Sequence, residues 1–144
     1  MKPSVHIRSV ATSFLVGMLI GVGGSVAIAA TAYSGWFSLG TTNGYSHDGQ
    51  TWASSDSRAG GGLLRSTSGS APTGWLGAEA QLTRNGALCA SVSTFYNSAP
   101  ATQLARSASG DCGSGNYRGM AYFYRWAGTY YSAAGRYFSP IVAW

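Results

Sequence analysis

The sequence feature that most constrains the fold is an alternation of apolar and polar residues over residues 76–96. Its first half places four apolar residues on one side of an extended chain: Leu76, Ala78, Ala80 and Leu82. The alternation resumes after Gly86, with Leu88, Ala90 and Val92 on one side. A side-chain period of two is the pattern of a half-buried β-strand. The stretch therefore predicts an antiparallel hairpin around which the rest of the chain packs.

The turn of this hairpin sets its register, because a slip of one residue moves every side chain to the other face. A three-residue loop with Gly86 in the left-handed conformation keeps both apolar stripes on one face and sets Leu82 opposite Leu88. A two-residue Asn-Gly turn would set Leu82 opposite Cys89 and mix the faces. The pattern therefore favours the three-residue loop. It also puts Cys89 on the face opposite the apolar stripe.

Further strand patterns recur along the chain, separated by turn residues. They cover residues 33–39, 45–53, 63–67, 102–107, 117–126, 129–133 and 137–144. Asp48-Gly49 predicts a turn within residues 45–53, and Ala134-Gly135 predicts another turn. The Gly-rich residues 54–62 predict a flexible loop. We predict an all-β fold, a compact antiparallel β-sandwich or barrel of about eight short strands, preceded by a signal-peptide helix.

The first 32 residues have the layout of a secretory signal peptide. The basic start consists of Lys2, His6 and Arg8, and an uncharged, largely apolar stretch follows. Two A-x-A patterns come next, and we place cleavage after Ala32, with Ala29 as the alternative. A retained anchor is the competing interpretation, because about 20 uncharged residues can span a bilayer. We expect a signal peptide over residues 1–32 and one secreted β domain over residues 33–144, with membrane contact only if the signal is not cleaved.

The two cysteines of the chain, Cys89 and Cys112, both lie beyond the predicted signal peptide. In an oxidising compartment they predict one disulfide, which the chain-entropy model values at about 3 kcal/mol. His47 is the one histidine beyond residue 32. Two cysteines and one distant histidine do not make a zinc site, so we expect no metal and no cofactor.

The residues suited to catalysis are few. His47 has no serine in a recognisable nucleophile motif to activate. A carboxylate pair for glycoside hydrolysis would have to come from Asp48, Asp56, Glu79 and Asp111, and of these Glu79 could meet Asp111 across the disulfide. Both residues also have the simpler interpretation of surface charges. The sequence predicts a protein with no catalytic residues that is not an enzyme.

Binding is the better supported function, because aromatic residues and arginines crowd the last third of the chain. They are Tyr117, Tyr122, Phe123, Tyr124, Trp126, Tyr130, Tyr131, Tyr137, Phe138 and Trp144, interleaved with Arg118, Arg125 and Arg136. Tyr, Trp and Arg are enriched at interface hot spots. We predict partner contacts at Trp126, Tyr130, Tyr131, Arg136 and Arg125. The alternative is that these rings serve as core and edge cover, since aromatic residues are also good strand formers.

The predicted partner is a secreted protein or a cell-envelope polymer, and a glycan is an alternative ligand because aromatic faces also stack on sugars. Beyond residue 32, seven arginines against four acidic residues give a net charge near +3. This small positive net charge is typical of a soluble exported protein, and it would also suit an anionic partner. We expect no nucleic-acid partner, because the sequence has no basic cluster or known binding motif and because export argues against one.

Two short segments resemble lactococcin 972-type bacteriocins, which are small exported β-sandwich proteins that act on envelope assembly. The segments are Gly35-Trp36 and Gly74-Trp75-Leu76-Gly77-Ala78-Glu79-Ala80, with Tyr45 and His47 between them. The resemblance implies a bacteriocin-like toxin as an alternative function. The chain departs from that family in its cysteine pair and its long aromatic last third. Its overall character is similar to small secreted actinobacterial proteins of unassigned function.

Overall fold

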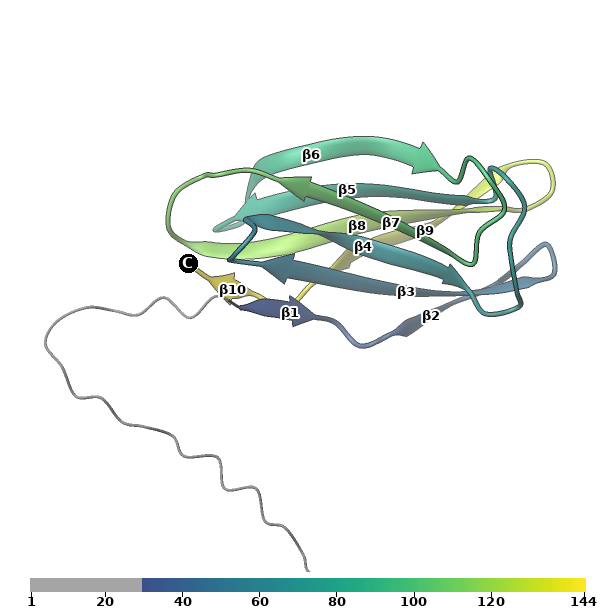
Figure 1. The fold of residues 1–144 in the computed structure, drawn as a ribbon, viewed down its shortest axis with the longest axis horizontal. Helices are drawn as coiled ribbons and strands as arrows, with labels where there is room; N and C mark the ends of the chain where they lie inside the picture. Colours follow the sequence, from purple (N-terminus) through teal and green to yellow (C-terminus); the bar gives the residue numbers. More distant parts are fainter. Residues whose placement is uncertain (1–29) are drawn as a thin grey trace, which may run out of the picture.

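The computed structural model describes residues 30–144, which form two packed antiparallel sheets (Figure 1). The first sheet contains β1 (Thr31–Tyr33), β2 (Phe37–Thr42), β3 (Tyr45–Ser54), β4 (Ala59–Ser66) and β7 (Gln103–Ser109). The second contains β5 (Leu76–Arg84), β6 (Ala87–Tyr96), β8 (Asn116–Trp126), β9 (Tyr131–Phe138) and β10 (Val142–Ala143). The predicted β-sandwich is confirmed, with ten strands rather than about eight. The predicted signal-peptide helix lies outside the described residues.

The two sheets are built on the same plan. In the first sheet, β3 pairs with β4 on one side and with both β1 and β2 on the other, and β7 follows β4. In the second sheet, β8 pairs with β5 on one side and with both β9 and β10 on the other, and β6 follows β5. Within residues 30–144 there is no helix long and apolar enough to span a membrane.

The apolar stripe of β5 lies at the centre of the sandwich, as its alternation predicts. Leu76, Ala78, Ala80 and Leu82 are all fully buried between the sheets. Leu76 and Ala78 join a core cluster with Phe123, and Leu82 joins a second cluster at the other end of the sandwich. Because β5 is flanked by β6 and β8, its backbone groups are paired on both sides. This strand is the structural centre of the second sheet.

The predicted three-residue loop of the β5–β6 hairpin is wrong. Asn85 and Gly86 form a two-residue turn, both with positive φ, at 50° and 82°. The register then shifts by one residue, because Cys89 is an extra residue in β6 before Leu82 pairs with Ala90. This bulge returns Ala90 to the core side after a turn that would otherwise have mixed the faces. The hydrophobic pattern is satisfied by the bulge rather than by the turn.

The same bulge overturns the predicted position of Cys89. Cys89 does not lie on the opposite face but packs with Ala90 and Val92 against the second core cluster. The predicted disulfide is confirmed: Cys89 is bonded to Cys112, with their Cα atoms 6.0 Å apart. It joins edge strand β6 to the loop between β7 and β8, so it links the two sheets. Leu88, before the bulge, is left 62% exposed.

Of the segment predicted as a flexible loop, residues 55–58 form a turn, whereas the Gly-rich residues 59–62 form the start of β4. A Cβ atom on Gly60 would lie 2.6 Å from the Cα atom of Gly119, on β8 of the opposite sheet. A Cβ atom on Gly62 would lie 2.5 Å from the Cβ atom of Ala121. These glycines are therefore required because the two sheets approach each other closely there, and not for flexibility.

Two other predicted turns also lie inside strands. Asp48-Gly49 is in the middle of β3, and Ala134-Gly135 is in the middle of β9. A Cβ atom on Gly49 would lie 2.6 Å from the Phe37 ring and 2.9 Å from the Phe123 ring. Gly49 thus makes room for aromatic side chains in the core. Gly135 is different: it has a positive φ of 94° at the bulge where β9 shifts its register against β8.

Candidate functional site

The outer face of the second sheet carries a continuous set of aromatic side chains. Alternation along β8 directs Ala121 and Phe123 into the core, so the residues between and after them face outward. We call this surface the tyrosine face; its residues are Tyr96, Tyr122, Tyr124, Trp126, Tyr131, Arg136 and Phe138. They come from β6, β8 and β9, and each is partly or fully exposed. The face forms because β8 and β9 are neighbouring strands and both carry aromatic residues at positions that face away from the core.

Aromatic contacts organise one end of the tyrosine face. The Tyr96 and Tyr131 ring centroids are 4.4 Å apart, and the Trp126 and Tyr131 centroids are 5.0 Å apart. The Tyr131 hydroxyl donates a hydrogen bond to the Gly74 carbonyl oxygen at 2.8 Å. A Cβ atom on Gly77 would lie 2.5 Å from the Tyr96 ring, so this ring covers the backbone of β5 at Gly77, which is buried. Glycine at position 77 is thus what allows Tyr96 to reach across the sheet.

The rings of this surface are inclined to one another. The interplanar angle is 36° between Tyr96 and Tyr131, 57° between Tyr96 and Tyr124, and 63° between Trp126 and Tyr131. Edge-to-face and tilted contacts are the arrangements that aromatic quadrupoles favour. The face therefore consists of interlocked rings rather than a row of parallel ones.

Burial raises the pKa of the Tyr96 hydroxyl above its ordinary value, and the neighbouring Tyr131 and Tyr124 add to the shift. The desolvated site disfavours the phenolate, so Tyr96 stays neutral at physiological pH. Its hydroxyl is thus available as a hydrogen-bond donor or acceptor to a partner.

Two guanidinium groups make the outer face of the second sheet electropositive. The Arg136 Nε atom donates to the Tyr122 hydroxyl at 2.6 Å, and its guanidinium lies 5.1 Å from the Tyr122 ring centroid. The Arg118 guanidinium lies 5.0 Å from the Phe138 ring centroid. The ion pairs among residues 30–144 involve other arginines, so these two have no carboxylate partner there. Glu79 is the acidic residue on this face.

The predicted contact residues separate into two groups. Trp126, Tyr131 and Arg136 lie together on the tyrosine face, and Tyr130 is 64% exposed in the turn between β8 and β9. Arg125 does not belong to this surface, because it is only 8% exposed and faces the core. Its predicted position on the binding surface is corrected by the alternation of β8: if Trp126 faces outward, its neighbour faces inward.

Arg125 is held by neutral acceptors at one end of the core. Its Nη1 atom donates to the Leu39 carbonyl oxygen, and its Nη2 atom donates to the Ser132 hydroxyl at 3.3 Å. Burial lowers the pKa of Arg125 from its ordinary value. His47, 3% exposed, lies close enough to feel this charge, and burial followed by the Arg125 charge lowers the pKa of His47 below 6.5. His47 is therefore a neutral core residue at pH 7.

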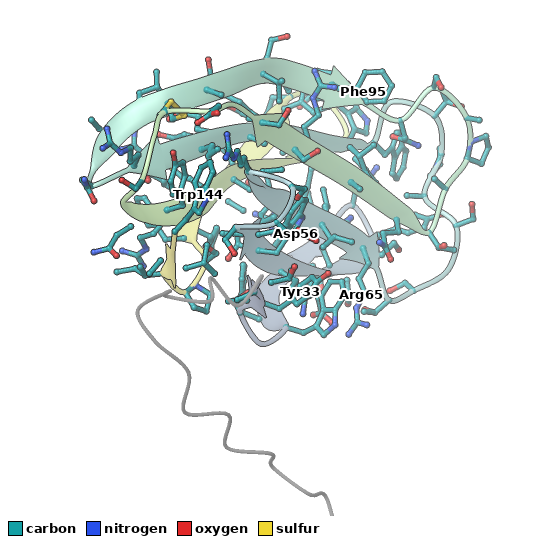
Figure 2. The ribbon with its side chains drawn as sticks, turned by 60° about the vertical axis from the view of Figure 1, so that its left-hand side comes forward. Tyr33, Asp56, Arg65, Phe95 and Trp144 are labelled. Atoms are coloured by element: carbon teal, nitrogen blue, oxygen red, sulfur yellow. A yellow bond between two sulfur atoms is a disulfide. The ribbon has the colours of Figure 1, made fainter. Side chains whose placement is uncertain are left out.

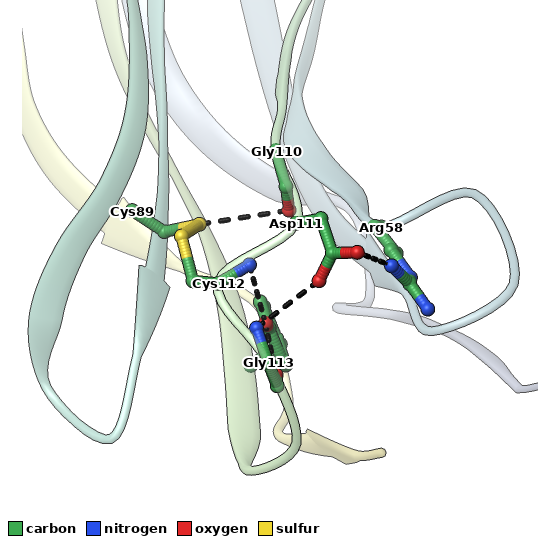
Figure 3. A network of polar contacts seen from close by, with 7 residues as sticks. Arg58, Cys89, Gly110, Asp111, Cys112 and Gly113 are labelled. Carbon is green, nitrogen blue, oxygen red and sulfur yellow. Dashed lines mark hydrogen bonds and ion pairs between the residues drawn. A yellow bond between two sulfur atoms is a disulfide. The ribbon is translucent and has the colours of Figure 1, made fainter.

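The acidic residues considered for catalysis are not brought together. Asp111 lies in the disulfide loop and forms an ion pair with Arg58, from the turn between β3 and β4 (Figure 3). Its Oδ1 atom also accepts a hydrogen bond from the Gly113 amide at 3.1 Å. Glu79 accepts hydrogen bonds from Gln81 and Thr94 on the outer face of the second sheet. The two carboxylates therefore serve separate local networks.

No cluster of His, Cys, Asp and Glu within residues 30–144 is suited to hold a metal ion. The disulfide loop is instead organised by hydrogen bonds. The Tyr117 hydroxyl donates to the Gly113 carbonyl oxygen at 2.5 Å and accepts from the Cys112 amide at 3.2 Å. Arg58 also stacks on Trp144, with 3.5 Å between its guanidinium carbon and the ring centroid. These contacts fasten the loop and the last strand to the first sheet.

Sequence reasoning missed Tyr96 as a member of the tyrosine face. Tyr96 ends a strand that is separated from the aromatic last third along the chain, and only the pairing of β6 with β5 brings it near Tyr131. Its neighbour Phe95 lies at the opposite margin of the domain from Tyr33 and Arg65 (Figure 2). The exposed Tyr33 of the first sheet is thus remote from this surface.

Comparison of the chain with protein-family models, with curated proteins and with solved structures gives no match.

Proposed function

We propose that this chain is a secreted, non-enzymatic binding protein that docks a protein partner through the tyrosine face. The observation that carries the proposal is the contiguous set of Tyr, Trp and Arg side chains on one outer sheet face. These residue types dominate interface hot spots because they bury large areas and also offer hydrogen bonds. Tyr131 and Phe138, 39% and 43% exposed, provide apolar area that a partner would cover.

The charge of the face favours a partner with an acidic patch. Arg118 and Arg136 contact aromatic rings and neutral oxygen atoms, so their charges are free to be complemented by carboxylates. An Arg–carboxylate contact can be bidentate, which adds orientation as well as affinity. The same charges would also speed association with an acidic partner at low salt.

A protein partner is favoured over a glycan by the ring geometry. Stacking on sugars is best served by coplanar rings in a groove, whereas the rings of Tyr96, Trp126 and Tyr131 are inclined by 36° and 63°. The tyrosine face lies on a sheet rather than in a cleft lined by several loops. Inclined rings suit the irregular side chains of a protein surface.

Secretion and the absence of catalysis are part of the same proposal. The disulfide between Cys89 and Cys112 is compatible with an oxidising compartment outside the cytosol. His47 is buried beside a guanidinium, so its imidazole is not accessible to a substrate as a general base has to be. The tyrosine face offers recognition chemistry and no nucleophile paired with a base.

The test is affinity capture of exported proteins from the producing organism, followed by quantitative comparison of variants. Tyr131→Ala and Arg136→Gln each remove one class of contact from the tyrosine face. Tyr33→Ala is the matched control, because Tyr33 is also an exposed strand tyrosine but belongs to the first sheet. Thermal melts accompany each capture, so that loss of binding can be separated from loss of folding.

We expect the wild type and Tyr33→Ala to capture one partner protein in equal amounts. Tyr131→Ala should capture at least tenfold less of it. Arg136→Gln should weaken capture most at low salt, where electrostatic attraction is strongest. Equal capture by all variants would place the binding surface elsewhere. A collapse of the thermal midpoint in Tyr131→Ala would assign this ring to the core.

A further inference from the structure

The domain begins earlier than the preferred cleavage site predicts. The Ala30 amide donates a hydrogen bond to the Ser55 hydroxyl at 2.9 Å, and the Ala30 carbonyl oxygen accepts one from the Ser55 amide at 2.9 Å. Ser55 is buried and directly follows β3. Ala30 is thus tied to the first sheet by both of its backbone polar groups.

Strand β1 continues this attachment through the residues that cleavage after Ala32 would remove. Thr31 pairs with Ser54 and Ala32 pairs with Ala53 in the antiparallel register of β3. The Thr31 hydroxyl donates to the Ser54 hydroxyl at 2.9 Å. Ala32 packs against the second core cluster, beside fully buried Ala53. Residues 30–32 therefore provide edge pairing and core contacts.

The two A-x-A sites have different consequences for these contacts. Cleavage after Ala32 would leave Tyr33 at the N-terminus and would expose the β3 edge at Ala53 and Ser54, together with buried polar groups of Ser55. Cleavage after Ala29 would keep every one of these interactions. The new amino group of Ala30 could still donate to the Ser55 hydroxyl.

We propose that the export machinery cleaves the chain between Ala29 and Ala30, so that the mature protein begins at Ala30. This inference rests on the proposed secretion. The signal peptidase hydrolyses the Ala29–Ala30 peptide bond with one water molecule, leaving a carboxylate on Ala29 and an ammonium group on Ala30. Ala27 and Ala29 are the small residues that this site requires. In the folded domain the Ala32–Tyr33 bond lies within a paired strand, which protects it from later trimming.

The test is intact-mass measurement of the protein secreted by a bacterial host that expresses the full chain. Two matched variants separate the sites. Ala27→Gln alters the first small residue of the site before Ala30, and Ala30→Gln alters the corresponding residue of the site before Tyr33. The Ala30 side chain is exposed and its hydrogen bonds use backbone atoms, so Ala30→Gln leaves the fold intact.

We expect a secreted wild type whose mass corresponds to residues 30–144. Ala30→Gln should mature at the same bond and at the wild-type rate, whereas Ala27→Gln should no longer yield a protein that begins at Ala30. A mass corresponding to residues 33–144, or a block of maturation by Ala30→Gln, would overturn the inference while leaving secretion in place. Retention of the whole chain in the cell would overturn both this inference and the proposed secretion.

Discussion

The close approach of the two sheets at Gly60 leads to a prediction that a single methyl group can test. In Gly60→Ala the added Cβ atom would lie 2.6 Å from the Gly119 Cα atom and 3.0 Å from the Gly119 nitrogen. These neighbours are backbone atoms of β8, so no side-chain rotation can relieve the contact. The sheets must separate or β4 must shift in register with β3 and β7.

The expected cost follows from this geometry. Overpacking of a core by one methylene group costs about 1–3 kcal/mol, and a contact with rigid backbone belongs at the upper end, about 3 kcal/mol. For a domain of this size, that corresponds to a thermal midpoint lowered by about 10 °C. Total stabilities of single domains are about 5–15 kcal/mol, so the variant should still fold.

The assay is equilibrium urea unfolding followed by tryptophan fluorescence, with thermal melts as a second measurement. The matched control is Gly35→Ala, because a Cβ atom on Gly35 would meet no atom within 4 Å. We expect the control to be within about 0.5 kcal/mol of the wild type, as is usual for surface substitutions. A Gly60→Ala protein as stable as the control would refute the reasoning that these glycines are there for sheet contact.

Four further predictions concern other parts of the molecule. Burial and the Arg125 charge lower the pKa of His47, so below pH 6.5 the unfolded chain binds a proton at this residue more readily than the folded chain does. The urea midpoint should therefore fall as the pH decreases from 6.5. His47→Gln should make the urea midpoint less dependent on pH in this range. Replacing Cys89 and Cys112 together by serine should cost about 3 kcal/mol in urea unfolding, and thiol titration of the native protein should find no free thiol. Asn97→Ala should cost about 3 kcal/mol by the same assay, because the buried Asn97 side chain makes three hydrogen bonds to backbone groups whose loss would leave them unpaired. The bacteriocin alternative predicts that the purified mature protein inhibits the growth of related bacteria, and the absence of a clearing zone at a dose of about 1 μM, far above the nanomolar affinity of specific complexes, would count against it.

The candidate binding site was partly foreseeable from the chain. Aromatic residues at alternate positions of residues 117–126 indicated a strand with rings on both sides, and the nearby turn suggested that Trp126 and Tyr131 are accessible. The pattern could not say which side of β8 faces the core. That choice is made by the opposite sheet, where Gly60 and Gly62 leave room for Gly119 and Ala121. It sends Arg125 inward and the tyrosines outward.

Local sequence by itself determined the all-β class, the buried stripe of β5 and the pairing of Cys89 with Cys112. The all-β class and the buried stripe follow from side-chain alternation with a period of two, and the disulfide follows from the presence of two cysteines. Neither signal depends on residues that are distant in the sequence. Only the tertiary structure decided the roles of the glycines. The backbone freedom that allows glycine in a turn and its lack of a side chain are properties of the same residue. Whether a glycine bends the chain, as in a turn, or admits a neighbour, as Gly49 admits aromatic rings and Gly60 admits strand β8, is therefore settled by what packs against it.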